Sequence, residues 1–426
     1  MAFTFERFAF YSAKWLMTIF IATAIAKGGL GLTSSDAAKM SANLVAFTYL
    51  APLIGSWISD RLVGARYLVP IGMTLMGIGY LAGWQAQSAA MVNIMIILVS
   101  IGTGLFKPQT NAITGRLFED KNKLDSAFST QYSFVNIGSF FGTTIMGVLA
   151  YKYGFRVCFL ICAIVMFIDA IWFLAGFRHL GDAGKKPFKL DEREVENIDV
   201  KVKAKPLTTI EKKRVAAIFL VSAFSIIFWL FWYLAYMPVY FHWAGDNPAA
   251  SWVIGGIQFS TAHFDSLNAL ACIVAGPLLG MLWERKARSP RGDWNMFQKT
   301  ALGLLLLGLA YAIFASAEVY RGNNLASLGW LIVFGIVLTL GEMVFSPLGN
   351  SFISKFSPPK LLTAMMSVWV LSIFFAGKSY GWLYDFTLKF DFAITYFVIA
   401  GIAVACGVIL WLLSGRLNNL VREEDE

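Results

Sequence analysis

Residues 181–206 read GDAGKKPFKLDEREVENIDVKVKAKP, a charged stretch that contains two prolines and few large apolar residues. This composition is typical of a linker. On either side, most of the chain consists of apolar runs of about 20 residues, the length that crosses a bilayer. The sequence therefore predicts two six-span halves joined by the linker. The predicted spans start near Phe3, Met40, Arg66, Met91, Ser126 and Arg156, and near Val215, Phe264, Met296, Ser327, Leu361 and Asp391.

The overall composition supports a multi-pass membrane protein. Apolar residues make up 58% of the 426 residues and charged residues 14%, whereas a soluble domain has about 45–50% and about 25%. The mean hydropathy is +0.64. These values exclude a disordered chain and a small disulfide-rich scaffold.

The distribution of basic residues predicts the orientation. The formal net charge is +9, and most basic residues outside the spans lie in the linker and the other loops that follow even-numbered spans. Such an excess marks cytoplasmic loops, so we expect a protein of the cell (inner) membrane with both termini in the cytoplasm, and no nucleic-acid partner. The predicted domains are an N-terminal six-helix bundle (1–178), a cytoplasmic linker (179–212), a C-terminal six-helix bundle (213–415) and a cytoplasmic tail (416–426).

Catalytic and metal chemistry are not indicated. Three histidines are scattered along the chain, and the four cysteines lie in apolar runs without metal-ligand spacing. No nucleophile–base pair stands in register, and no ring-forming filter motif of a channel is present. We therefore expect no enzyme activity, no catalytic residue, no metal and no cofactor.

Charged residues inside the predicted spans indicate a binding cavity. A Lys, Arg or Asp at a helix centre costs about 2.5–3.5 kcal/mol, so it persists where it is paired or lines a polar cavity. In FERFAFYSAKW (5–15), Arg7, Tyr11 and Lys14 share one helix face. Snorkelling to the interfaces is the alternative for the two cations. The other intramembrane charges are Glu6, Lys107, Asp169 and Glu342.

Two of these charges stand beside prolines. Pro108 follows Lys107, and Pro347 lies five residues after Glu342. Proline removes a helical hydrogen bond, which predicts broken helices that line a cavity. Cations in the first half and an acid in the second would fit a zwitterion with separated ends, such as a peptide, an amino acid or a betaine.

The loop GSWISDRLVGAR (55–66) resembles the loop signature of the major facilitator superfamily. Two six-span halves with a long cytoplasmic linker are the architecture of that superfamily. The resemblance gives Asp60, Gly64 and Arg66 a structural role, and we expect Asp60 and Arg66 to pair. An ordinary positive-inside loop is the alternative. The fold class is thus an all-α membrane protein with twelve helices in two bundles.

Six further segments resemble the proton-dependent oligopeptide transporter family of that superfamily. ERFAFY (6–11) is similar to the end of its ExxERFxYY motif, and GLFKPQTN (104–111) to its GLFKPN segment. The remaining four segments follow in the family's order: QYSFVNIGSFFG (131–142), FDSLNAL (264–270), LTLGEMVFSPLG (338–349) and MMSVWVL (365–371).

The resemblance implies roles for individual residues. Arg7, Tyr11 and Lys107 would bind the peptide carboxylate with help from Asn136, although a helix–helix hydrogen bond is as good a reading for Asn136. Glu342 and Asn268 would bind the amino group. The side-chain pockets would be lined by Tyr49, Trp229 and Trp369, for which packing is the alternative.

The implied function is import of di- and tripeptides with protons by alternating access, and the chain is expected to act as a monomer in the lipid bilayer. The proton-coupling residues would be Glu6, Arg7 and Lys107. Because adjacent helix positions are about 100° apart, we expect Glu6 to pair with Lys107 and not with Arg7.

Two acids of the family are missing, since their positions hold Phe3 and Tyr233. Their loss leaves open another substrate, such as nitrate, an amino-acid derivative or a drug-like anion, without proton coupling. Two roles are open for Asp169, pairing with a neighbouring span and carrying protons, and we favour the pairing.

Overall fold

The structure is a computed structural model that describes residues 2–117, 121–187, 207–290, 292–358 and 361–422. The chain divides into two compact units, Met1–Lys203 and Ala204–Glu426. Most of the predicted linker and the end of the predicted tail lie outside the described residues.

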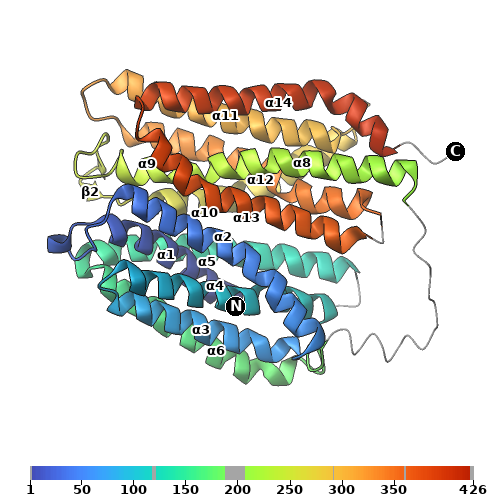
Figure 1. Cartoon of the computed structure of the whole chain (residues 1–426), viewed down its shortest axis with the longest axis horizontal. Helices are drawn as coiled ribbons and strands as arrows, with labels where there is room; N and C mark the ends of the chain where they lie inside the picture. The colour runs from blue at the N-terminus through green and yellow to red at the C-terminus, as the bar shows by residue number, and fades with distance from the viewer. Residues whose placement is uncertain (1, 118–120, 188–206, 291, 359–360, 423–426) are drawn as a thin grey trace. The chain divides into compact units, whose positions relative to one another are not determined.

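Unit 1 is a bundle of six long helices (Figure 1). Two 3₁₀ turns, η1 (Ile25–Lys27) and η2 (Gly176–His179), follow the first and last helices. The helices are α1 (Ala2–Ala22), α2 (Ser34–Arg61), α3 (Ala65–Gln85), α4 (Ala89–Leu117), α5 (Lys121–Tyr153) and α6 (Phe155–Ala175). α1 packs against α5, α6 and α2, while α3 packs against α4 and α6.

Unit 2 contains six long helices, one short helix and a two-stranded hairpin. The short helix α9 (Tyr236–Phe241) continues almost directly from α8 (Thr209–Leu234), and β1 (Val253–Ile254) pairs with β2 (Ile257–Gln258) in antiparallel register. α11 packs against α14 and α12, and α8 packs against α13. The other long helices are α10 (Ala262–Ala287), α11 (Met296–Arg321), α12 (Leu328–Phe356), α13 (Leu362–Thr387) and α14 (Phe392–Arg422).

Local sequence explains where several helices begin. Thr33, Thr208 and Asn295 each form a capping box, in which the cap side chain and the residue three positions later satisfy each other's backbone donors. The helix exteriors are apolar, and side chains such as Ile171 and Leu412 are 66% and 74% exposed. An apolar exterior is what a bilayer requires.

The prediction of an all-α membrane protein is confirmed. Within the described residues, twelve helices have 21 or more residues, and ten of them are long and apolar enough to cross a membrane. α1 is also long enough, but it carries three charged residues, Glu6, Arg7 and Lys14. This charged helix begins the candidate site.

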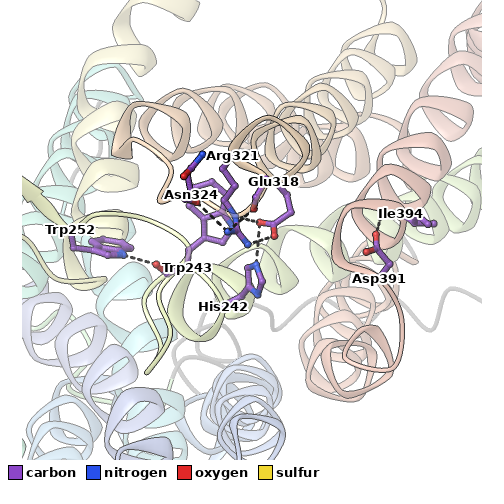
Figure 2. Close-up of polar contacts among 9 residues, drawn as sticks. His242, Trp243, Trp252, Glu318, Arg321, Asn324, Asp391 and Ile394 are labelled. Atoms are coloured by element: carbon purple, nitrogen blue, oxygen red, sulfur yellow. Dashed lines mark hydrogen bonds and ion pairs between the residues drawn. The ribbon is translucent and has the colours of Figure 1, made fainter.

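One end of unit 2 is held together by polar contacts that the sequence did not indicate (Figure 2). His242 Nε2 lies 3.1 Å from Glu318 Oε2, and Arg321 Nε donates to the same oxygen at 2.9 Å. The His242 ring stacks on Phe392 at 4.0 Å. Nearby, Trp252 Nε1 donates to the Trp243 carbonyl oxygen at 2.7 Å. These contacts link the segment after α9 to the residue before β1, to the end of α11 and to the start of α14.

Candidate functional site

The polar face of α1 is buried inside unit 1. Glu6 is fully buried, and Arg7 and Lys14 are 7% and 6% exposed. This burial contradicts the snorkelling alternative, in which both cations would reach the membrane surface. The cationic residues that the sequence places on one face of α1 are therefore buried.

Glu6 pairs with Arg7 and not with Lys107. Arg7 Nε donates to Glu6 Oε2 and Nη2 donates to Oε1, so that the guanidinium and the carboxylate form a bidentate ion pair. The predicted Glu6–Lys107 pair is thus wrong for this conformation. The side chains of adjacent helical residues do leave the helix in directions about 100° apart. Two long flexible side chains can nevertheless bend back toward each other.

Arg7 also contacts the aromatic rings that follow it on α1. Its guanidinium carbon lies 4.5 Å from the centroid of Phe10 and 5.5 Å from that of Tyr11. Cation–π contacts of this kind hold a guanidinium in place. The structure therefore brings together the predicted pair Arg7 and Tyr11.

Lys107 lies in α4 beside Tyr49 of α2. Its ammonium nitrogen is 5.3 Å from the centroid of the Tyr49 ring, and it lies within electrostatic range of Glu6 and Arg7. Two residues assigned to different roles, the carboxylate clamp and the side-chain pocket, are therefore neighbours in unit 1.

The predicted break at Pro108 is wrong, because α4 runs without interruption from Ala89 to Leu117. The proline leaves the Gly104 carbonyl without its helical donor. α2 crosses at this point: a Cβ on Gly55 would meet the Gly104 oxygen at 2.0 Å. One turn further, Gln109 Nε2 donates to the Gly55 carbonyl at 2.7 Å. Close packing thus supports the helix and fixes Lys107 beside α2.

The glycines of the segment 131–142 bring α5 onto α1. A Cβ on Gly138 would lie 2.3 Å from the Thr4 carbonyl oxygen, and one on Gly142 would lie 2.5 Å from that of Phe8. Asn136 is buried on the same helix, where its Nδ2 donates to the Tyr132 carbonyl at 3.1 Å. This bond lies within α5, so it is not the helix–helix bond that was the alternative for Asn136.

In unit 2, Glu342 and Asn268 are in direct contact. Asn268 Nδ2 of α10 lies 2.7 Å from Glu342 Oε2 and 3.0 Å from Thr339 Oγ1, both on α12. The family resemblance assigned Glu342 and Asn268 to one subsite, and the structure brings them together. The predicted break at Pro347 is wrong, since α12 continues from Leu328 to Phe356.

Trp229 and Trp369 belong to one aromatic cluster in unit 2. Both rings pack against Phe345, with centroid distances of 6.4 Å from Trp229 and 6.3 Å from Trp369. Gly349 makes room for the second indole, because a Cβ there would lie 1.9 Å from Trp369 Cζ2. The sequence analysis missed Phe345, although it lies three residues after Glu342, a spacing that puts both on one helix face.

Phe3 and Tyr233 stand at the two positions where the family resemblance leads us to expect acids, and both rings pack against other aromatic rings. Phe3 packs edge-on against Phe106 at 5.3 Å within unit 1. Tyr233 stacks against Tyr380 at 5.6 Å within unit 2. Apolar packing therefore replaces charge at both positions.

Arg66 anchors the segment that leaves α6. Its Nη1 and Nη2 donate to the carbonyls of Gly181 and Phe177 at 3.1 and 3.2 Å. Gly64 also packs there, because a Cβ would meet the Lys185 carbonyl oxygen at 2.3 Å. The expected ion pair of Arg66 with Asp60 is not formed, and the guanidinium binds backbone carbonyls instead.

Metal ligands do not gather in the part of the chain that the structure describes, where no group of three His, Cys, Asp or Glu side chains could hold an ion. Each unit contributes a polar set of its own. In unit 1 the set consists of the cations Arg7 and Lys107 with Glu6, and in unit 2 it consists of Glu342 with Asn268.

Comparison with known proteins assigns the fold family. The model of the Major Facilitator Superfamily matches residues 5–378. The chain belongs to this superfamily. An uncharacterized transporter, YclF, of Bacillus subtilis is 25% identical over 98% of this chain and 92% of its own length. Dipeptide and tripeptide permease A of Cronobacter turicensis is 24% identical over 99% of this chain and 92% of its own.

Solved structures of peptide transporters have a fold similar to that of this chain. A mutant of peptide transporter POT in complex with alafosfalin has a TM-score of 0.88 and 25% identity, covering 99% of this chain and 94% of that one. A POT family transporter in complex with a thioalcohol-conjugated peptide has a TM-score of 0.87 at 22% identity, which supports the fold alone. The resemblance to the oligopeptide transporter family is confirmed by these relatives.

Proposed function

We propose that this protein is a secondary active transporter that imports di- and tripeptides by proton symport. The observation that carries the proposal is the split of opposite charges between the units. Unit 1 holds the buried Arg7 and the half-buried Lys107, and unit 2 holds the half-buried Glu342 with its amide partner Asn268. A peptide has one carboxylate and one ammonium, so each set carries the charge opposite to one end of the substrate. The relatives named dipeptide and tripeptide permease support this substrate class.

The proposed roles follow the chemistry of each set. Arg7, Tyr11 and Lys107 bind the carboxylate, Asn136 assists, and Glu342 with Asn268 binds the ammonium. Tyr49, Trp229 and Trp369 contact the peptide side chains, because aromatic surfaces accept varied apolar groups. The protein acts as a monomer in the inner membrane with both termini and the linker in the cytoplasm, the orientation that the basic loops favour.

Proton coupling would use the Glu6–Arg7 pair. While Glu6 is ionised, it neutralises Arg7 and competes with the substrate carboxylate. Protonation of Glu6 frees the guanidinium for the peptide, so proton and peptide binding favour each other. Lys107, which is within electrostatic range of both, adds a second positive charge.

A thermal-shift experiment on purified protein tests the substrate class. A ligand that binds the folded state at 100 times its Kd stabilises it by about 2.7 kcal/mol. Free di- and tripeptides should raise the unfolding temperature, whereas N-acetylated dipeptides and single amino acids should do so far less. Stabilisation by nitrate or a drug-like anion, without any by peptides, would support the alternative that the aromatic residues at Phe3 and Tyr233 leave open.

A further inference from the structure

Asp169 is a buried acid with no role in the site described above. It lies in α6 and is fully buried, and neither carboxylate oxygen has a hydrogen-bond partner in the residues that the structure describes. The favoured prediction, a structural pairing with a neighbouring span, is therefore wrong for this conformation. An ionised carboxylate without a partner is very costly in such surroundings, so the neutral acid is the stable form.

The surroundings of Asp169 place it close to the polar face of α1. Asp169, Met166 and Cys162 form one buried stripe on α6, which packs against α1, α3 and α5. Glu6 is within electrostatic range of Asp169. The other buried charged or titratable groups that these helices bring to the core are Arg7 and Lys14 of α1, Tyr80 and Arg66 of α3, and Cys158 and Cys162 of α6.

Along the part of α5 whose side chains the structure describes, the remaining titratable side chains are exposed. These are Tyr132, Tyr151, Lys152 and Tyr153. At the end of α6, Arg178 and His179 are exposed as well. Glu6 is therefore the one other acid that faces Asp169 within the described part of unit 1.

Two carboxyl groups in one apolar core do not both ionise readily. Glu6 has the Arg7 guanidinium as a partner, whereas Asp169 has no hydrogen-bond partner among the described residues. The negative charge therefore resides on Glu6, and the proton resides on Asp169.

We propose that Asp169 is a second proton-binding residue of unit 1 and that its titration is coupled to the charge of Glu6. In this conformation the proton is on an Asp169 Oδ. When Asp169 releases this proton it becomes a carboxylate, and its negative charge favours the binding of a proton by Glu6. Glu6 is then neutral and releases Arg7, so the charge of the core is unchanged while the guanidinium becomes available. The benefit to symport rests on the proposed function, but the coupling of the two acids does not.

Infrared difference spectroscopy on the purified full chain tests the protonation directly. Wild-type protein at neutral pH should show the C=O stretching band of a buried carboxylic acid. Asp169→Asn should remove that band, Asp169→Glu should restore one, and Asp60→Asn, a control at a half-buried acid, should leave it unchanged. A wild-type band that persists in Asp169→Asn, or the absence of any band in the wild type, would overturn the proposal.

Glu6→Gln tests the coupling of the two acids. Removal of the neighbouring negative charge makes ionisation of Asp169 easier, so the band should disappear at a lower pH than in the wild type. An unchanged titration would show that the two acids are independent. Because this readout involves no peptide, it stands even if the wild type imports none.

A transport measurement then tests the consequence for symport. In liposomes with an imposed pH gradient, Asp169→Asn should lose proton-driven accumulation of a labelled dipeptide far more than it loses peptide exchange. Accumulation at the wild-type level would remove Asp169 from coupling. Failure of the wild type itself to accumulate peptide would instead count against the proposed function.

Discussion

Glu6 and Arg7 are neighbours in sequence and partners in a bidentate ion pair inside unit 1, where Glu6 is fully buried and Arg7 is nearly so. A guanidinium whose charge is already neutralised cannot bind a substrate carboxylate at full strength. We therefore expect that whatever neutralises Glu6 also makes Arg7 available. Protonation of Glu6 and binding of a peptide carboxylate to Arg7 should then favour each other.

The first prediction concerns the stability of this pair. Removal of one partner of a buried ion pair leaves an uncompensated charge and costs about 3–5 kcal/mol. Glu6→Gln should therefore lower the unfolding temperature strongly, and the double variant Glu6→Gln/Arg7→Gln should recover part of the loss. Thermal unfolding in detergent measures both.

A matched control exists in unit 2. Glu284 and Arg288 also form an ion pair, but their side chains are 62% and 77% exposed. Exposed pairs contribute about 0–1 kcal/mol, so Glu284→Gln should change the unfolding temperature little. Equal effects of Glu6→Gln and Glu284→Gln would show that the buried pair has no special energetic weight.

The second prediction concerns the peptide amino group. Glu342→Gln removes the charge that the ammonium would meet but keeps a side chain that can bond Asn268. Binding of a free-amino dipeptide should weaken by at least tenfold, which corresponds to about 1.4 kcal/mol. Binding of an N-acetylated analogue, weak already, should change little. Equal loss for both ligands in a calorimetric or fluorescence titration would contradict the assignment.

The third prediction uses Gly349, which leaves room for the Trp369 indole. Gly349→Ala forces this ring to move, and overpacking of this kind costs about 1–3 kcal/mol. Dipeptides with a bulky side chain should lose more affinity than glycine-containing ones. Gly401→Ala is the control, since a Cβ there meets nothing within 4 Å. If both variants bind the peptide panel alike, the aromatic cluster around Phe345 is not a side-chain pocket.

The fourth prediction is topological. Cys158, Cys162 and Cys272 are buried, so Cys406→Ser provides a background with low reactivity. In that background, Lys186→Cys should react with an impermeant thiol reagent only from the cytoplasmic side. Tyr320→Cys, at a residue that is 79% exposed, should react from outside. The reverse pattern would invert the orientation.

Much of the fold followed from the sequence, because spans are set by length and apolarity, and both can be read from the residues. The family resemblance also assigned Asn268 and Glu342 to one subsite, and the two side chains are in contact in the structure. The helix breaks that the sequence predicted at Pro108 and Pro347 are not formed, because α4 and α12 continue across both prolines. A proline removes one hydrogen bond, but tight packing such as that of Gly55 against Gly104 supports the helix across it.

Side-chain partners were harder to predict than helices. The ideal helix angle argued against Glu6 pairing with Arg7, yet a long arginine side chain reaches back to its neighbour. Arg66 found backbone carbonyls in place of Asp60, because the carbonyls that end a helix are strong acceptors. Phe345 went unnoticed, since one phenylalanine among many carries no signal until its ring contacts are known.

Uptake by the purified protein in sealed liposomes tests peptide–proton symport most directly. With an inward pH gradient, the wild type should concentrate a labelled dipeptide above its external level, and a protonophore should abolish this accumulation. Glu6→Gln should abolish it too, while Asp60→Asn should preserve it. Dipeptide uptake that never exceeds equilibration, or accumulation that survives both the protonophore and Glu6→Gln, would contradict proton-coupled import through this site.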